Sequence, residues 1–194
     1  LLLSAVELMP EHLVAHLTLA GVAEESGDLA GAASALEAAA NASSTNEEKA
    51  ANLYRAATLW QDKAGEPGRA RAALEAVASL DPAYEDVFSR LQTIYIAEGA
   101  RQELASLLEA RLAAVTDPAE RVELEVLRGR ALADVGDPAA AKRALAAALD
   151  ANPDHVEALS AFADVCAAEE DWVGAEEAWI RLARLASEPA QQIA

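Results

Sequence analysis

The sequence has few of the residues on which most catalytic and metal sites depend. Among 194 residues there are one cysteine, Cys166, and three histidines, His12, His16 and His155. One cysteine cannot form an internal disulfide, and no cysteine–histidine cluster is present to bind zinc. His12 and His16 have metal-ligand spacing but no accompanying carboxylate set. There is also no glycine-rich phosphate loop and no serine–histidine–aspartate set. We therefore expect no enzyme activity, metal or cofactor.

Positive charge is also scarce. Fifteen Lys and Arg residues stand against 33 Asp and Glu, which gives a formal net charge of −18. A chain this acidic repels phosphate backbones and anionic membranes, which argues against nucleic-acid binding. The charge favours a protein or peptide partner with basic residues, although solubility alone also explains an acidic surface. No apolar run approaches the roughly 18 residues of a membrane span, so we expect no membrane insertion.

The apolar residues that are present favour helices. Aromatic residues make up only 4% of a chain that is 53% hydrophobic, so alanine and leucine must form the core. Alanine has the highest helix propensity, and β-branched residues are few. The composition therefore predicts an all-α fold.

One segment shows how the helices are laid out. Gly136-Asp137 predicts a tight turn, Pro138 suits a first helical turn, and Asn152-Pro153 predicts a helix end. This pattern recurs with a period of roughly 34 residues. It divides the chain into five repeats, 13–46, 51–84, 85–118, 122–155 and 156–189, with 1–12 as the closing helix of a preceding repeat and 190–194 as a tail or the start of a further helix.

The repeats share a packing pattern. A small residue in the second helix of four repeats lets that helix approach the first closely, and a larger apolar residue follows four positions later on the same face. The small residues are Ala32, Ala70, Ala141 and Ala175, and the larger ones are Leu36, Leu74, Leu145 and Trp179. Extra residues follow the first and third repeats, at 47–50 and 119–121, and Thr45 and Asp117, just before them, are predicted helix N-caps. We expect Cys166, Trp172 and Trp179 to pack in the core.

These residues give the chain a resemblance to the tetratricopeptide repeat (TPR) family over essentially its whole length. The fourth repeat alone matches the family pattern at Gly129, Ala141, Leu145, Ala148 and Pro153. The resemblance implies a right-handed α-solenoid, a superhelix of stacked antiparallel helix pairs forming a single array over 1–194. It also implies that the first helices line a concave face that holds a peptide or a partner helix.

Carried onto this sequence, that face predicts a partner-binding set of mixed apolar, polar and charged residues. The set is Leu17, Asn52, Arg55, Leu59, Arg90, Thr93, Ile96, Val126, Arg130 and Asp164. The leading hypothesis is therefore a non-catalytic protein-interaction scaffold of a bacterial type.

Two alternatives stay open. The chain is a spacer or regulatory arm of a larger multidomain enzyme, or it assembles with itself by end-to-end stacking of repeats. Both ends suggest a segment of a longer array, because Leu1 is not preceded by Met and no polar capping helix follows 189. The absence of a visible signal peptide therefore says nothing about the compartment.

Overall fold

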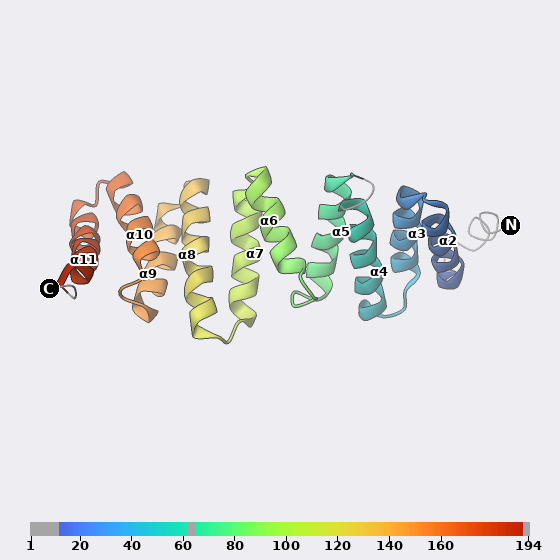
Figure 1. Ribbon diagram of the computed structural model, residues 1–194, viewed down its shortest axis with the longest axis horizontal. Coiled ribbons are helices and arrows are strands. Elements are labelled where there is room, and N and C mark those ends of the chain that lie inside the picture. The colour runs from blue at the N-terminus through green and yellow to red at the C-terminus, as the bar shows by residue number, and fades with distance from the viewer. Residues whose placement is uncertain (1–11, 62–64, 192–194) are drawn as a thin grey trace. The chain divides into compact units, whose positions relative to one another are not determined.

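The computed structural model describes residues 12–61 and 65–191, with side chains described up to residue 187. Within these residues it contains helices and no strand (Figure 1). The helices are α2 (Leu13–Ser26), α3 (Leu29–Ala42), α4 (Asn46–Leu59), α5 (Pro67–Leu80), α6 (Val87–Glu98), α7 (Arg101–Ala114), α8 (Pro118–Val135), α9 (Pro138–Ala151), α10 (Val156–Ala168) and α11 (Trp172–Gln191).

The chain divides into two compact units, Leu1–Ile94 and Tyr95–Ala194, with the boundary inside α6. In the first unit, α2 packs on α3, α3 on α4 and α4 on α5. In the second, α7 to α11 pack in sequence, and α8 also contacts α10. Each contact between consecutive helices joins antiparallel neighbours, as the solenoid prediction requires (Figure 1). The single array over 1–194 and its repeat boundaries stay a prediction.

In each Gly-Asp turn the glycine is the C-cap of one helix and the aspartate is the N-cap of the next. Gly27 and Gly136 adopt left-handed backbone, with φ of 81° and 89°, and their N–H groups donate to carbonyls of the preceding helix. Glycine has no Cβ, so this conformation costs it little. Asp28 and Asp137 then accept a hydrogen bond from a backbone N–H of the next helix's first turn. Together the two residues end one helix and cap the next.

The extra residues between repeats, 47–50 and 119–121, lie inside helices α4 and α8. Thr45 accepts a hydrogen bond from the Glu48 N–H, and α4 begins at the next residue. Asp117 accepts one from Ala119, and α8 begins at Pro118. Both predicted N-caps are confirmed, and the extra residues of each spacer form the first turn of the following helix.

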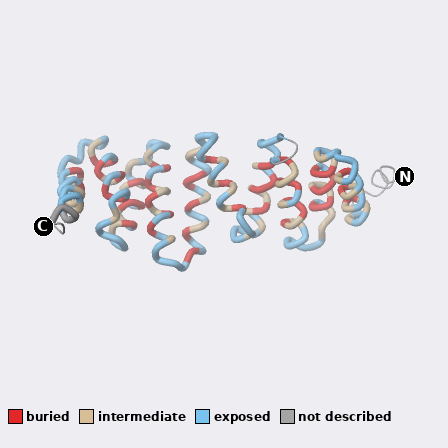
Figure 2. The backbone as a smooth tube through the Cα atoms, in the orientation of Figure 1, coloured by how far each residue is buried: buried red, intermediate tan, exposed pale blue. Residues whose placement is uncertain are grey.

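The predicted packing pattern is confirmed at its small residues. Ala32, Ala70, Ala141 and Ala175 are fully buried, as are Leu36, Leu74 and Leu145. In each unit the buried residues lie on the sides of the helices that face other helices, and the turns are exposed (Figure 2). Cys166 is a buried free thiol, as predicted.

The last helix departs from the prediction. Trp172 and Trp179 are 61% and 47% exposed, so the expectation that both pack in the core is wrong. Trp179 occupies the repeat position at which Leu36 and Leu145 are buried. In those repeats another helix follows and packs on the same one, α4 on α3 and α10 on α9, whereas α11 packs on α10 and no described helix follows it.

The ends of the chain are described only in part. The closing helix predicted over 1–12 lies almost wholly outside the described residues, and His12 is the N-cap of α2. Helix α11 runs through Pro189 to Gln191, past the predicted repeat end. Over the described ranges, no helix is both long enough and apolar enough to span a membrane.

Candidate partner-binding face

The predicted partner-binding residues lie on α2, α4, α6, α8 and α10, the first helices of the five predicted pairs. They divide between the two units. Leu17, Asn52, Arg55, Leu59, Arg90 and Thr93 belong to the first unit, and Ile96, Val126, Arg130 and Asp164 to the second.

In the second unit, α8 and α10 enclose an open hollow of about 280 Å³. We call this hollow the α8–α10 cavity. Its volume is close to the lower limit of about 300 Å³ for small-molecule pockets, so it has room for one or two side chains. A second hollow of about 370 Å³ continues from it toward the end of α8 and shares four of its residues. The cavity is lined by Arg130, Ala133, Asp134, Ser160, Ala161, Asp164 and Val165.

The lining combines an apolar floor with charged edges. Ala161 and Val165 are buried, whereas Ser160 and Asp164, on the same turns of α10, are exposed. The arrangement follows from helical periodicity, because residues four apart lie on one face. The structure thus brings together two predicted site residues, Arg130 and Asp164. Sequence reasoning missed Ala161 and Val165 as residues of the cavity lining, although their apolar spacing of four is a usable signal.

The chain itself neutralises two charges at this cavity. Arg130 Nη1 lies 3.6 Å from Glu157 Oε2, and Arg101 Nε lies 3.1 Å from Asp134 Oδ2. These four side chains are between 36% and 64% exposed, so each pair contributes only about 0–1 kcal/mol to stability. Asp164 has no hydrogen bond or ion pair within the part of the chain that the structure describes. It is therefore the uncompensated charge of the cavity.

In the first unit, the corresponding cation is also paired. Arg55 Nη2 on α4 donates to Glu24 Oε1 on α2 at 3.1 Å. Leu17 and Leu59 are half-buried because they pack against the core formed by Ala20, Leu36 and Trp60, among others. Arg55 therefore offers a partner an exposed but already neutralised cation, and the two leucines offer only part of their apolar surface.

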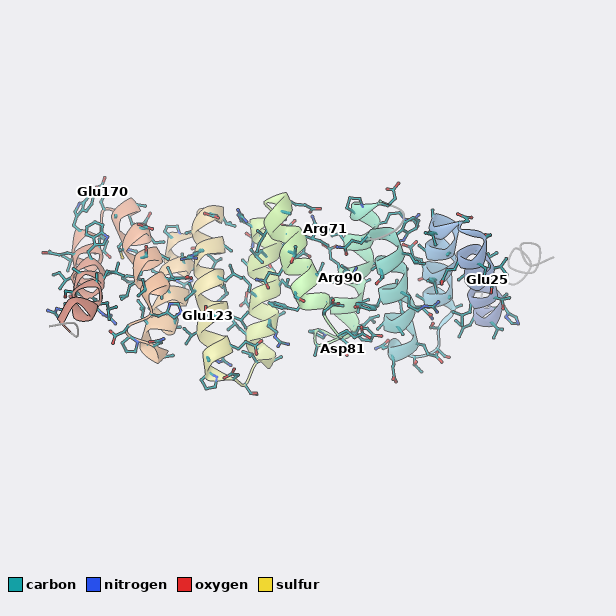
Figure 3. The ribbon with its side chains drawn as sticks, viewed as in Figure 1. Glu25, Arg71, Asp81, Arg90, Glu123 and Glu170 are labelled. Carbon is teal, nitrogen blue, oxygen red and sulfur yellow. The ribbon has the colours of Figure 1, made fainter. Side chains whose placement is uncertain are left out.

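Arg90 acts within the first unit instead of projecting into solvent. Its guanidinium donates to Thr58 Oγ1 at 3.0 Å and to Gln61 Oε1 at 2.6 Å, which links α6 to α4 and to the residue just past its end (Arg90 is labelled in Figure 3). It also lies 5.4 Å from the ring centre of Tyr54, within cation–π range. The Tyr54 hydroxyl donates to Asp86 Oδ1 at 2.6 Å, and this hydrogen bond is the main reason that the pKa of Tyr54 is raised to about 12.

Two predicted residues are buried, so they are removed from the partner-contacting set. Val126 is 2% exposed because α8 is covered by α7, α9 and α10, which leaves less of its circumference free than the repeat pattern implies. Asn52 is 8% exposed, and its amide donates to Ser43 Oγ at 3.2 Å. Thr93 and Ile96 are exposed, and Thr93 Oγ1 donates to the Ser89 carbonyl oxygen.

Two further contacts of titratable side chains in the second unit cap and link its helices. His155 Nδ1 accepts a hydrogen bond from the Ala158 N–H, while its Nε2 lies 3.1 Å from Glu123 Oε1 (Glu123 is labelled in Figure 3). The Lys142 ammonium, 3.0 Å from Asp171 Oδ2, lowers the pKa of that carboxyl. Over residues 12–61 and 65–191, no three His, Cys, Asp or Glu side chains converge in a way that would hold a metal ion.

Comparisons with known proteins inform the fold. No family model matches the chain, and no curated protein does so either. Among solved structures, MamA from Desulfovibrio magneticus RS-1 is similar, with 17% identity, a TM-score of 0.54 and coverage of 91% of this chain and 96% of that chain. YrrB, described as a TPR protein with an unusual peptide-binding site, is also similar. It has 19% identity and a TM-score of 0.54, and the match covers 93% of this chain and 90% of that chain.

A third similar structure is the C-terminal part of a TPR repeat-containing protein from Cytophaga hutchinsonii. It is 15% identical, with a TM-score of 0.56, and the match covers 96% of this chain and 72% of that chain. At such low identity these likenesses bear on the fold alone. The fold is that of TPR proteins, which confirms the predicted all-α solenoid of stacked helix pairs.

Proposed function

We propose that this chain, whose helix pairs have the TPR fold, is a non-catalytic scaffold that binds a protein or peptide on its first helices. The observation that carries the proposal is the α8–α10 cavity, an open hollow with an apolar floor and exposed polar edges on two adjacent first helices. Binding sites for extended segments combine these two features, because apolar pockets give affinity and edge groups give specificity.

A non-catalytic role fits the chemistry of the same region. The cavity lining contains no histidine, cysteine or tyrosine, and Ser160 has no histidine beside it in the lining. Cys166 is fully buried, and burial raises the pKa of its thiol, which opposes formation of the nucleophilic thiolate. The acidic net charge supports a partner that carries basic residues.

Capture experiments test this function. The chain would be immobilised and exposed to lysate of its source organism, beside an Asp164→Lys variant and a matched Asp150→Lys variant on the exposed surface of α9. We expect a protein that is captured by the parent chain and by Asp150→Lys but lost with Asp164→Lys. Equal capture by all three chains, or by none, would contradict the proposed face and favour a spacer role.

A second candidate function is self-assembly through the last helix. Trp172, Val173, Trp179 and Ile180 are between 44% and 72% exposed on α11, which is a large apolar surface for one helix. If copies stack through this surface, sedimentation velocity will show oligomers that grow with protein concentration, and Trp179→Glu will return the chain to a monomer. A monomer at every concentration would exclude this candidate.

A further inference from the structure

We infer that the α8–α10 cavity is a subsite for a lysine or arginine side chain of an extended peptide, with an apolar side chain of the same peptide beside it. The inference rests on the proposed function and specifies the chemistry of the segment bound. The first observation that supports the inference is the net charge that remains at the cavity after the chain's own ion pairs are counted.

The cavity and its continuation are lined by one cation and three carboxylates: Arg130 against Asp134, Asp164 and Glu169. Arg130 is held by Glu157, which lies next to the cavity and adds a fourth carboxylate. Arg101 partly offsets Asp134 from outside the lining. Asp164 lines both hollows and has no partner among the described residues. The net charge that faces an incoming segment is therefore negative.

The floor of the cavity defines the neighbouring side chain. Ala133, Ala161 and Val165 present small apolar surfaces beside Asp164. In an extended peptide, side chains two residues apart lie on one face at a separation of about 7 Å. A basic side chain at Asp164 therefore places the side chain two residues away over the apolar floor. An acidic side chain in the same position would meet Asp164 and Asp134 and would be repelled.

Small model peptides test this subsite. We would use three fluorescein-labelled peptides, VSKSVSKS, VSESVSES and VSQSVSQS, which carry Val and the variable residue on one face when extended. Binding would be followed by fluorescence anisotropy at low and at physiological salt. We expect the Lys peptide to bind at least about 10-fold more tightly than the Gln peptide, the Glu peptide not to bind, and affinity to fall with salt.

Two matched variants distinguish a subsite from general attraction to an acidic protein. Asp164→Asn and Asp150→Asn remove the same charge from exposed positions, the first inside the cavity and the second on α9. We expect Asp164→Asn to weaken binding of the Lys peptide about 5-fold, the change that corresponds to about 1 kcal/mol, and Asp150→Asn to leave it unchanged. Equal weakening by both variants would overturn the inference.

The outcomes separate this inference from the proposed function. If the Gln peptide binds as tightly as the Lys peptide, the basic subsite is overturned while peptide binding on this face stands. If no peptide binds but a lysate protein is captured and then lost with Asp164→Lys, the subsite is again overturned and the scaffold function stands. If no protein is captured either, both proposals fail.

Discussion

Arg130 on α8 is ion-paired with Glu157 on α10, with 3.6 Å between Nη1 and Oε2. The two side chains are 47% and 64% exposed, so the pair adds at most about 1 kcal/mol to stability. The pair engages the one cation of the cavity lining and leaves Asp164 as the unpaired charge that the proposed peptide would meet.

The Arg130–Glu157 pair leads to a first prediction. Arg130→Gln releases Glu157 and makes the cavity more negative, so we expect the affinity for VSKSVSKS to rise about 2- to 5-fold, which corresponds to about 0.5–1 kcal/mol. Arg143→Gln, which removes the same charge from an exposed position on α9, should leave the affinity unchanged. A fall in affinity with Arg130→Gln would mean that Arg130 itself holds the peptide.

The contact between Gly129 and Leu145 gives a second prediction. A Cβ at residue 129 would lie 2.5 Å from Leu145 Cγ, closer than Cβ contacts in proteins come, so Gly129→Ala forces the buried Leu145 side chain out of its present position. Overpacking costs about 1–3 kcal/mol, which exceeds the gain of about 1 kcal/mol in helix propensity. We expect a net loss in the free energy of unfolding measured with urea.

Gly21 is the matched control for this substitution. It lies inside α2, and a Cβ there would meet nothing within 4 Å. Gly21→Ala should therefore raise stability by about 0.5–1 kcal/mol. Stabilisation by both substitutions would show that the close approach of α8 and α9 is not needed.

The turn between α10 and α11 gives a third prediction. Glu170 has φ of 58° and takes the place that left-handed Gly136 has in the preceding repeat (Glu170 is labelled in Figure 3). Left-handed backbone costs a residue with a Cβ about 1–2 kcal/mol. Glu170→Gly should therefore stabilise the chain by about 0.5–1 kcal/mol after the added freedom of the unfolded glycine is subtracted.

The neighbouring residue provides the control for the turn. Glu169 has φ of −90°, which any residue adopts without strain. Glu169→Gly should therefore lower the free energy of unfolding, because it adds freedom to the unfolded chain and relieves no strain. If both substitutions change the free energy of unfolding in the same direction, relief of strain at Glu170 does not explain the effect of Glu170→Gly.

The Lys142–Asp171 pair gives a fourth prediction, on pH. The hydrogen bond from Lys142 is the largest cause that lowers the pKa of Asp171 below its ordinary value of 3.8. A depressed carboxyl pKa adds stability that is present above the unfolded value and is lost as pH falls through the folded value. Lys142→Gln should move the pKa of Asp171 upward in a carbon-13 NMR titration of the carboxyl carbons.

Arg143 serves as the control for this titration. It is the adjacent cation on α9 and is exposed, and Asp171 does not owe its shift to it. Arg143→Gln should therefore leave the pKa of Asp171 where it is in the parent chain. An equal rise in the pKa of Asp171 with both variants would mean that the overall positive charge of α9, and not the hydrogen bond from Lys142, lowers this pKa.

Much of the fold could be predicted because local signals and packing agree. The spacing of Ala141 and Leu145 predicted their burial, and both are fully buried. Thr45 and Asp117 predicted helix starts, since an N-cap depends only on the next two or three residues. Such features need no knowledge of which helices lie further away.

The candidate site was less predictable because exposure depends on neighbours. Val126 and Arg130 lie four residues apart on α8, yet Val126 is buried and Arg130 faces the cavity. Trp179 follows the same repeat pattern as Leu145 but remains 47% exposed, because α11 packs on α10 and no described helix follows it. A repeat position predicts on which face of its helix a residue lies. Whether that face is buried depends on which helices pack against it.

The most direct test of the proposed face is site-specific photocrosslinking. Benzoylphenylalanine would be placed at Ser160, which is exposed in the lining of the α8–α10 cavity, or at Ala147, which is exposed on α9. With the captured partner present, we expect crosslinks from residue 160 and none from residue 147. Crosslinks from residue 147 alone would contradict the proposed face and would place the partner on the second helices.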